Sequence, residues 1–516
     1  MNRSGLGGTR TRRPAPAQRR RILPAAAACL VAALGCATTH ADLRLDVELA
    51  IKTTVMPGAK VAVSICDTQS SRTLVSVNAA VPMIPASNMK LFTSGAALHV
   101  LGPDFEFVTR LLRDGDRLIV VGDGDPGFAD PYLLDEMQIG DQDGIDLESF
   151  LQIWVTRVVG TGLKSISEIV VDDRVFDREF VHPTWPVDQL NRRYCAQIAG
   201  LNFHLNLLHF YPRPRKGMRP DITIFEPAAR WLKLTNRATS NDGVHDNNTA
   251  WIARQIGTNN LTFLGNVKFP YRSPVPVTVH DMPAFFVRLL AARLEAAGVE
   301  VGGYRLIGMQ EPPSGGELVA AVRTPMSTVM TRCNRDSCNL YAECLLKRMG
   351  AALTPQSGSW INGSAILRHV IHERLADPTV SAKVLVADGS GLSRENRVTA
   401  ESITAWLNTF PNDERLGPTF IGSLAVAGKT GTLRKRFKNK NAKLHGALIQ
   451  GKSGFINNVS TFSGYVTMPD GQRRSFSILV NGFDGPARPA KKLQETIVIA
   501  IAADMAAAVA LGLGGE

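Results

Sequence analysis

Ser87 and Lys90 lie three residues apart in the run Ser87-Asn88-Met89-Lys90, a spacing that places two side chains on the same face of a helix. A serine hydroxyl becomes nucleophilic when a base takes its proton, and a lysine amine can be that base once its pKa falls about 3 units from about 10.4. Burial and a neighbouring cation both lower a lysine pKa. The pair predicts a nucleophilic serine with a lysine base, although a chain of this length contains about two such spacings by chance.

A second candidate, Ser337-Cys338-Asn339, interrupts an apolar helical stretch with polar side chains. Taken alone, the run is typical of a solvated helix end or of a turn. Beside the first pair, it predicts a hydroxyl and a carboxamide that line the same cleft.

A lysine motif occurs twice, as Gly428-Lys429-Thr430-Gly431 and as Gly451-Lys452-Ser453-Gly454. Catalysis requires such a motif on a strand beside the nucleophile, where a glycine lets the substrate approach the backbone. Lys452 lies in an apolar run that opens a hairpin. Lys429 precedes a strongly basic loop, which is a poor wall for a cleft. We therefore assign the cleft to Lys452, Ser453 and Gly454.

Taken in order, the three motifs read S-x-x-K, S-x-N and K-[ST]-G, the pattern of penicillin-binding proteins and serine β-lactamases. The long interval between Ser87 and Ser337 indicates which of these proteins the chain resembles most. An interval of this kind is similar to the one in the class C, low-molecular-mass penicillin-binding proteins, which are the D-alanyl-D-alanine carboxypeptidase/endopeptidase family S13.

Longer runs extend the resemblance over essentially the whole chain beyond residue 41. The run 85–90 resembles the family's PASNxK, 337–345 its SDNLYAExL and 388–394 its DGSGLSR. Residues 431–436 resemble a GTLxxR stretch that precedes the family's third motif, which agrees with the choice of Lys452. Two residues depart from the pattern: Cys338 stands where aspartate is usual, and Ser453 where threonine is usual.

The resemblance implies acyl transfer to water at a D-alanyl peptide bond. Ser87 attacks the carbonyl between two D-alanines or at a D-amino-acid cross-link, Lys90 is its base, and the acyl-serine is hydrolysed. Ser337 passes a proton towards the leaving amine. The implied partners are peptidoglycan peptides, with β-lactam antibiotics as covalent inhibitors, and no cofactor or metal is implied.

The resemblance also implies a set of substrate-binding residues. Asn339 binds the substrate's backbone amide, and Lys452 and Ser453 hold its terminal carboxylate. Lys452 also helps to lower the pKa of Lys90. The backbone N–H groups of Ser87 and Phe455 form the oxyanion hole. Gly454, the last residue of the lysine motif, also belongs to the substrate-binding set.

These residues must be positioned by an α+β fold of the penicillin-binding-protein and serine β-lactamase type, with an antiparallel sheet flanked by helices. We expect the catalytic domain to be discontinuous, over residues 42–100 and 321–516, and interrupted at 101–320 by one or two strand-rich domains. Strands are predicted at 60–66, 73–77, 446–456, 459–468 and 474–482. Helices are predicted from near Ser87, over 324–349 and 357–376, and over 491–511, the last as a docked core helix.

The first 41 residues read as a secretory signal peptide, with seven arginines, no acid, an apolar run at 22–34 and a cleavage site before Asp42. Alternatives are a membrane anchor or a lipoprotein cut before Cys36. The formal net charge of +12 falls to +5 beyond this segment, which does not favour nucleic acid as a partner. We expect a periplasmic protein with peripheral or no membrane contact. The five cysteines beyond Ala41 leave their pairing open.

Two other functions share the same motifs. A β-lactamase would use them without needing the insertion, and no motif for a deacylating glutamate is apparent. A wall-binding or penicillin-sensing protein would keep the fold and lose deacylation.

Overall fold

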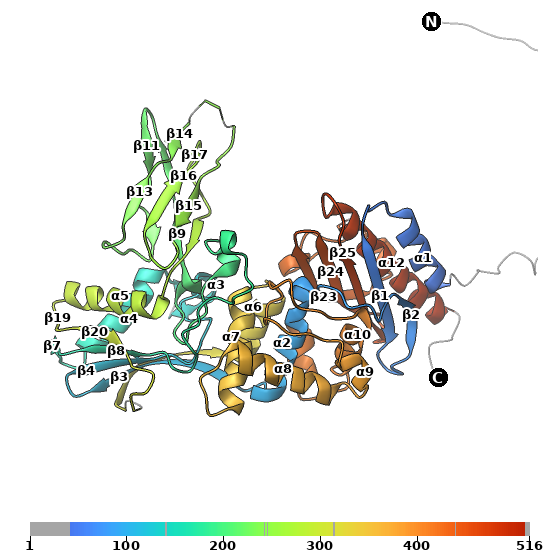
Figure 1. Cartoon of the computed structure of the whole chain (residues 1–516), viewed down its shortest axis with the longest axis horizontal. Helices are drawn as coiled ribbons and strands as arrows, with labels where there is room; N and C mark the ends of the chain where they lie inside the picture. Colours follow the sequence, from blue (N-terminus) through green and yellow to red (C-terminus); the bar gives the residue numbers. More distant parts are fainter. Residues whose placement is uncertain are drawn as a thin grey trace, which may run out of the picture. The chain divides into compact units, whose positions relative to one another are not determined.

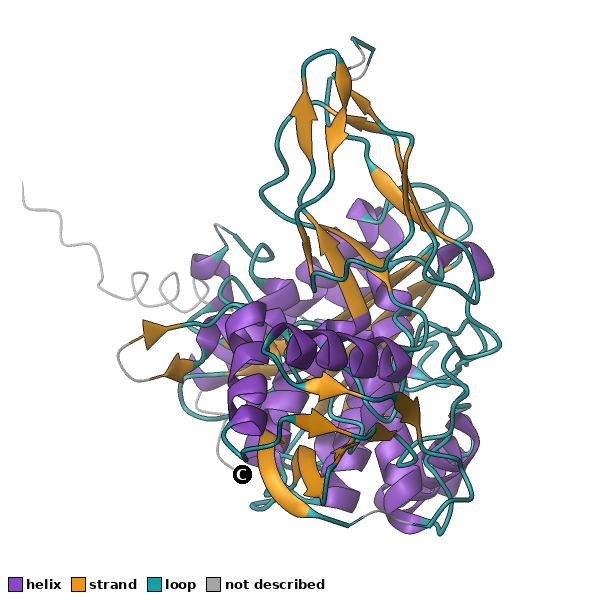
Figure 2. Ribbon diagram, turned by 90° about the vertical axis from the view of Figure 1, so that its left-hand side faces the viewer, coloured by secondary structure: helices purple, strands orange, loops and turns teal. Residues whose placement is uncertain are grey.

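The computed structural model describes residues 42–139, 142–241, 243–244, 246–312, 315–438 and 440–510. The predicted signal peptide, residues 1–41, lies outside the described residues. Helices and strands both occur through the described chain (Figure 1), and Figure 2 shows them coloured by type. The α+β class expected from the sequence is confirmed.

A six-stranded antiparallel sheet joins the two ends of the described chain. Its strand order is β2 (Thr73–Val77), β1 (Lys60–Asp67), β25 (Arg473–Asn481), β24 (Val459–Thr467), β23 (Leu448–Ile456) and β22 (Ala425–Val426). β1 pairs with β25 over its whole length, from Lys60 opposite Asn481 to Asp67 opposite Arg474. The predicted strands therefore form, and segments far apart in the sequence complete one sheet.

Side chains alternate between the two faces of this sheet, as a two-residue period requires. On β25, Phe476 and Ile478 pack in one apolar cluster with α1 (Leu43–Thr53) and α12 (Arg488–Ala510), whereas Leu479 packs in a second cluster among the other helices. α12 is long and apolar enough to cross a membrane by length and composition alone. Its buried residues, among them Leu493 and Ile497, lie in the first cluster.

The second cluster contains helices that position the predicted site. They are α2 (Met89–Leu101), α6 (Met326–Asn334), α7 (Asn339–Leu353), α8 (Trp360–Arg374), α10 (Ala400–Asn408) and α11 (Gly417–Gly422), with the short α9 (Pro378–Ser381) beside α8. The expectation of one continuous helix over 324–349 is wrong. The chain leaves the helix after α6, turns at Ser337, whose φ is +62°, and starts α7 at Asn339.

The segment between α2 and α6 has its own buried core, built from residues between Leu111 and Val299. Its five-stranded sheet has the order β20 (Tyr304–Leu306), β8 (Ile169–Asp172), β4 (Arg117–Val121), β3 (Glu106–Asp114) and β21 (Glu317–Pro325). The segment is less purely strand-rich than the sequence suggested, because α4 (Leu147–Val159) and α5 (Met282–Ala296) supply much of this core.

Shorter elements complete the segment. They are α3 (Pro131–Glu136), β5 (Gln138–Ile139), β6 (Gln142–Asp143), β7 (Ser165–Ile166), β9 (Leu207–Phe210), β10 (Arg213–Arg215), β11 (Met218–Asp221), β12 (Phe225–Glu226), β13 (Leu234–Asn236), β14 (Thr239–Ser240), β15 (Trp251–Arg254), β16 (Leu261–Leu264), β17 (Asn266–Val267), β18 (Val275–Thr278) and β19 (Glu300–Val301). The strands among them form sheets of two or three strands. Several of these, such as β11 and β13 to β17, are labelled in the upper left of Figure 1.

Candidate active site

Ser87 lies in a single 3-10 turn, Ala86–Asn88, that runs directly into α2. Ala86 has a φ of +45°, a left-handed conformation that is strained for a residue with a side chain. Gly391 comes so close that a Cβ there would stand 1.8 Å from the carbonyl oxygen of Ala86. The loop that contains Gly391 therefore packs directly against the turn that carries Ser87, and only glycine fits at this contact.

Lys90, in the first turn of α2, directs its amine at Ser87. Its Nζ lies 3.2 Å from Ser87 Oγ, and it donates to Asn339 Oδ1 and to the carbonyl of Ser390, each at 2.7 Å. The side chain is fully buried, and burial lowers the pKa of Lys90 although neighbouring acidic groups oppose the change. These two acceptors take two of the amine's three directions, and the third is aimed at the Ser87 hydroxyl.

Ser337 and Lys452 form the opposite side of the site. Lys452 is fully buried on β23, and its Nζ donates at 2.8 Å both to Ser337 Oγ and to the carbonyl of Ser453. Burial, with a smaller contribution from the charge of Lys90, lowers the pKa of Lys452 well below its ordinary value. Two lysines and two serines thus converge, as the sequence motifs predicted.

Asn339 is brought to the same place, with both ends of its carboxamide in use. Its Oδ1 accepts from Lys90, and its Nδ2 donates at 2.8 Å to the carbonyl of Tyr194. A substrate amide would therefore have to share or displace one of these contacts. Its role in substrate binding stays a prediction.

β23 lies against the turn that carries the nucleophile. A Cβ on Gly454 would stand 2.9 Å from the backbone nitrogen of Ser87, so no larger residue fits there. β23 pairs with β22 only through Gly451 and Gln450. The edge of the strand beyond Gly451, which includes Phe455, has no pairing strand among the described residues, so an extended peptide can pair there.

The other lysine motif lies outside this cluster. Lys429 is exposed in the turn after β22, whereas Thr432 in the same loop hydrogen-bonds Ser453 Oγ at 3.0 Å through its own hydroxyl. The basic loop that follows borders a cavity beside Ser453, with Lys435, Arg436 and Lys440 in its wall. The expectation that this loop is a poor wall for a cleft is therefore wrong.

Two buried carboxylates, Glu343 and Asp388, hold the loop beside the site. The sequence motifs assigned no role to either of them. Glu343 accepts from the backbone N–H groups of Gly389 and Ser390, at 3.0 and 2.8 Å. Asp388 accepts from the N–H of Gly391 at 2.8 Å. These bonds fix the loop whose Ser390 carbonyl holds Lys90. Burial, then the charge of Asp388, raises the pKa of Glu343 to about 7.

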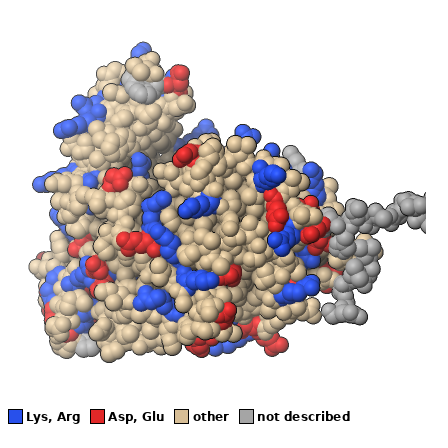
Figure 3. Space-filling model, turned by 45° about the vertical axis from the view of Figure 1, so that its right-hand side comes forward, with Lys and Arg blue, Asp and Glu red and all other residues tan. Residues whose placement is uncertain are grey.

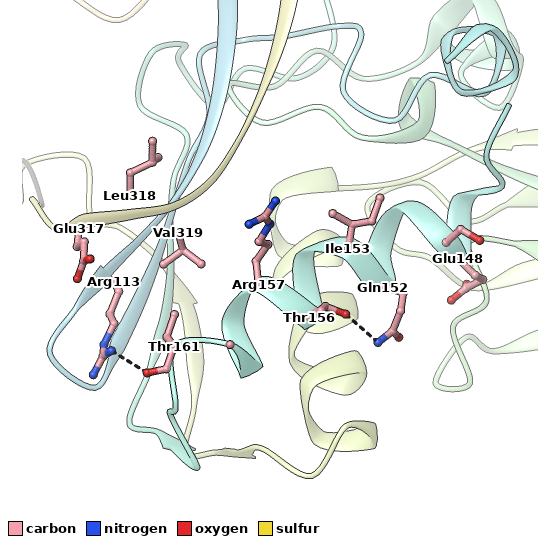
Figure 4. Close-up of a pocket in the computed structure, with 12 residues that line it drawn as sticks. Arg113, Glu148, Gln152, Ile153, Thr156, Arg157, Thr161, Glu317, Leu318 and Val319 are labelled. Atoms are coloured by element: carbon pink, nitrogen blue, oxygen red, sulfur yellow. Dashed lines mark hydrogen bonds between the residues drawn. The ribbon is translucent and has the colours of Figure 1, made fainter. Parts of the chain in front are cut away.

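Two cavities meet at Ser87 and Ser337. The larger, about 1200 Å³, is bordered by Asn339 and Tyr194, and the smaller, about 670 Å³, by Ser453 and Gly454. A third hollow of about 1130 Å³ lies between α4 and β21 and contains none of the predicted site residues (Figure 4). Within the described ranges, no group of three or more His, Cys, Asp or Glu side chains could hold a metal ion.

All five described cysteines are unpaired, and Cys338 is the only one of them that is not fully buried. It lines the larger cavity between Ser337 and Asn339, and burial raises the pKa of its thiol. A raised pKa favours the protonated thiol, which is a weak nucleophile.

Comparison with known proteins places this site in a family. Residues 43–502 match the D-Ala-D-Ala carboxypeptidase 3 (S13) family. A D-alanyl-D-alanine carboxypeptidase from an Actinomadura species is 30% identical over 485 residues, which cover 89% of this chain and 84% of the relative. The D-alanyl-D-alanine carboxypeptidase DacB of Haemophilus influenzae is 23% identical and covers 78% of this chain, with 81% of its own length matched.

A solved structure shares the fold. Penicillin binding protein 4 (dacB) from Haemophilus influenzae superposes with a TM-score of 0.71 at 20% identity, over 87% of this chain and 98% of that protein. The same protein complexed with a β-lactam superposes with a TM-score of 0.67. With the family match over residues 43–502, these findings establish that the chain belongs to the D-Ala-D-Ala carboxypeptidase (S13) family.

Proposed function

We propose that this protein is a serine-type D-Ala-D-Ala peptidase that acts on peptidoglycan peptides and is inhibited by penicillin. The observation that carries the proposal is the hydrogen-bonding of Lys90: Asn339 and Ser390 hold two directions of its amine, and the third is aimed at Ser87 Oγ, 3.2 Å away. Family membership gives the reaction class, and the β-lactam complex of the structural relative supports the inhibitor.

The proposed steps use the groups that converge in the site. Lys90 takes the Ser87 proton as Oγ bonds to the carbonyl carbon, and the charge on the carbonyl oxygen is held by the N–H groups of Ser87 and Phe455. The C–N bond then breaks, and the leaving amine receives a proton through Ser337. Water adds to the ester and releases the acid, which restores Ser87. A β-lactam amide follows the first step and remains attached.

Two further features belong to the same proposal. The intervening segment, residues 101–320, is an inserted domain or pair of domains, supported by its separate core.

The mature protein starts near Asp42 and works in the periplasm, supported by the order of basic, apolar and small residues before it. N-terminal sequencing should find Asp42. An intact Met1 or a lipidated Cys36 would contradict this placement.

The decisive experiment combines a labelled penicillin with a D-Ala-D-Ala pentapeptide. A stable adduct on the peptide that contains Ser87, together with release of D-alanine, is expected. Rapid penicillin turnover would indicate a β-lactamase, and an adduct without cleavage of the pentapeptide would indicate a sensor.

Ser87→Ala should abolish both labelling and cleavage and leave the free energy of unfolding within about 1 kcal/mol, since the Ser87 hydroxyl caps no helix and its hydrogen bond with Lys90 contributes about that much. Ser327→Ala, at an exposed site on α6, is the matched control and should label normally. If Ser87→Ala still labelled on the same peptide, Ser87 would not be the nucleophile.

A further inference from the structure

The smaller cavity lies on the leaving-group side of the nucleophile. The two cavities share Ser87 and Ser337, but only the larger contains Asn339, predicted to bind the substrate's backbone amide, and only the smaller contains Ser453, predicted to bind the terminal carboxylate of the leaving group. A peptide attacked by Ser87 therefore directs its leaving amine and everything attached to it into the smaller cavity.

Six basic side chains border this smaller cavity, which we call the basic groove. They are Lys435, Arg436, Lys440, Arg488, Lys491 and Lys492. The only acidic side chain that borders it within the described part of the chain is Glu495. On the face of the molecule seen in Figure 3, by contrast, both basic and acidic side chains are present. A cleft of one charge sign concentrates ligands of the opposite sign.

Glu495 joins the two walls of the groove and does not neutralise it. Its carboxylate accepts from Arg436 Nε at 3.1 Å and from Lys440 Nζ at 2.6 Å. Arg436 also donates to Gln494 Oε1 and to the carbonyl of Lys491, at 3.1 and 3.0 Å. These bonds fasten the loop after β22 to the start of α12, so the groove is formed before a ligand enters.

The other four cations have no acidic partner among the residues that the structure describes. Lys435, Arg488 and Lys492 are exposed, and Lys491 Nζ lies over the Phe455 ring at 5.7 Å. The first turn of α12 contains no acidic side chain. Four positive charges thus face the groove uncompensated, next to the hydroxyl groups of Ser453 and Thr432.

We propose that the basic groove binds further carboxylates of the leaving group, so that the preferred substrate is a peptide cross-link and not a free D-alanyl terminus. The inference rests on the proposed peptidase function. A departing D-alanine carries one carboxylate, and Lys452 and Ser453 are already the residues predicted to hold it. The amine released from a cross-link belongs to a second peptide that carries additional carboxylates. The groove's 670 Å³ also suits a ligand much larger than one alanine.

The test compares two substrates with the same acyl side. One is the D-Ala-D-Ala pentapeptide, and the other is a cross-linked dimer whose leaving peptide keeps its free carboxylates. The variant Lys435→Gln/Arg488→Gln/Lys492→Gln removes three of the four charges and spares Lys491, which contacts Phe455. We expect the ratio of kcat/KM for the dimer to that for the pentapeptide to fall about tenfold, because electrostatic focusing of this kind changes rates by that order or more.

Lys438→Gln/Lys443→Gln is the control, since both residues are exposed on the same loop and neither borders the groove. It should leave both rates and their ratio within about twofold. A dimer with amidated carboxylates should be cleaved equally by wild type and the groove variant. In wild type, salt should slow dimer cleavage more than pentapeptide cleavage, because exposed charges are screened beyond about 8 Å at 0.15 M.

The outcomes separate the two proposals. If the groove variant lowers both rates equally, or leaves the ratio unchanged, the basic groove does not select the leaving group and the inference is wrong. If wild type cleaves neither substrate, it is the peptidase function itself that fails. Circular dichroism and a thermal melt of each variant establish that the substituted surfaces remain folded.

Discussion

Lys452 and Lys429 carry the same motif letters in different surroundings, and the surroundings decide which lysine matters. Lys452 is fully buried with its amine on Ser337, and Lys429 is exposed. We expect Lys452→Ala to lower the rate of penicillin acylation at least about a hundredfold, since one well-placed donor contributes roughly 3 kcal/mol to the transition state. Lys429→Ala should leave it within a few fold. Acylation rates of both variants decide the matter, and the opposite ranking would place Lys429 in the cleft.

The limits of sequence reasoning at the residue scale follow from what a residue type can specify. Ser87, Lys90, Ser337 and Lys452 were found because their side-chain chemistry depends on type and spacing, and the structure brings all four together. The carbonyl of Ser390 escaped notice, because every residue has a carbonyl and only the fold decides which one faces Lys90. The double engagement of Asn339 was missed for the same reason.

At the scale of elements, the break between α6 and α7 is the feature that presents Ser337. Ser337 has a φ of +62°, where a residue with a Cβ is strained and glycine is not. We therefore expect Ser337→Gly to be more stable than Ser337→Ala by about 1 kcal/mol in chemical denaturation.

Both variants remove the hydroxyl that accepts from Lys452, so both should slow acylation to the same degree. If Ser337→Ala were as stable as Ser337→Gly, the left-handed turn would not persist in solution. If only one of the two slowed acylation, the loss would come from the backbone and not from the hydroxyl.

Hairpins were easier to predict than this break. The strands 446–456, 459–468 and 474–482 were predicted to within two residues of β23, β24 and β25, because alternation and turn residues are local signals. The residues around Ser337 continue a helical pattern on both sides. The contacts that interrupt it come from elsewhere in the chain, such as the N–H of Thr432 bonded to the carbonyl of Arg335.

At the scale of the whole molecule, a buried ion pair connects the intervening segment to the helices of the site. Asp130 is fully buried and accepts from Arg332 Nε at 2.9 Å and from the Tyr341 hydroxyl at 2.6 Å. We expect Asp130→Asn to lower the free energy of unfolding by about 1–3 kcal/mol, because Arg332 loses a fully buried carboxylate partner and keeps Asp336, 2.8 Å away. Denaturation by urea gives the measurement.

Asp104→Asn is the matched control, since Asp104 is exposed in the same segment. Its stability should change by no more than about 0.5 kcal/mol. Equal losses in the two variants would show that the pair with Arg332 contributes nothing beyond the removal of a carboxylate. A loss confined to Asp130→Asn would identify this contact as a principal bond between the two parts of the chain.

The pairing of β1 with β25 also determines when the catalytic sheet can form during synthesis of the chain. A ribosome makes Asp67 long before Arg473, and at about 5–20 residues per second the delay is on the order of 20 to 80 s. During that delay the first strand of the catalytic sheet has no partner on its β25 side, so the sheet that supports the nucleophile cannot close until translation is nearly over.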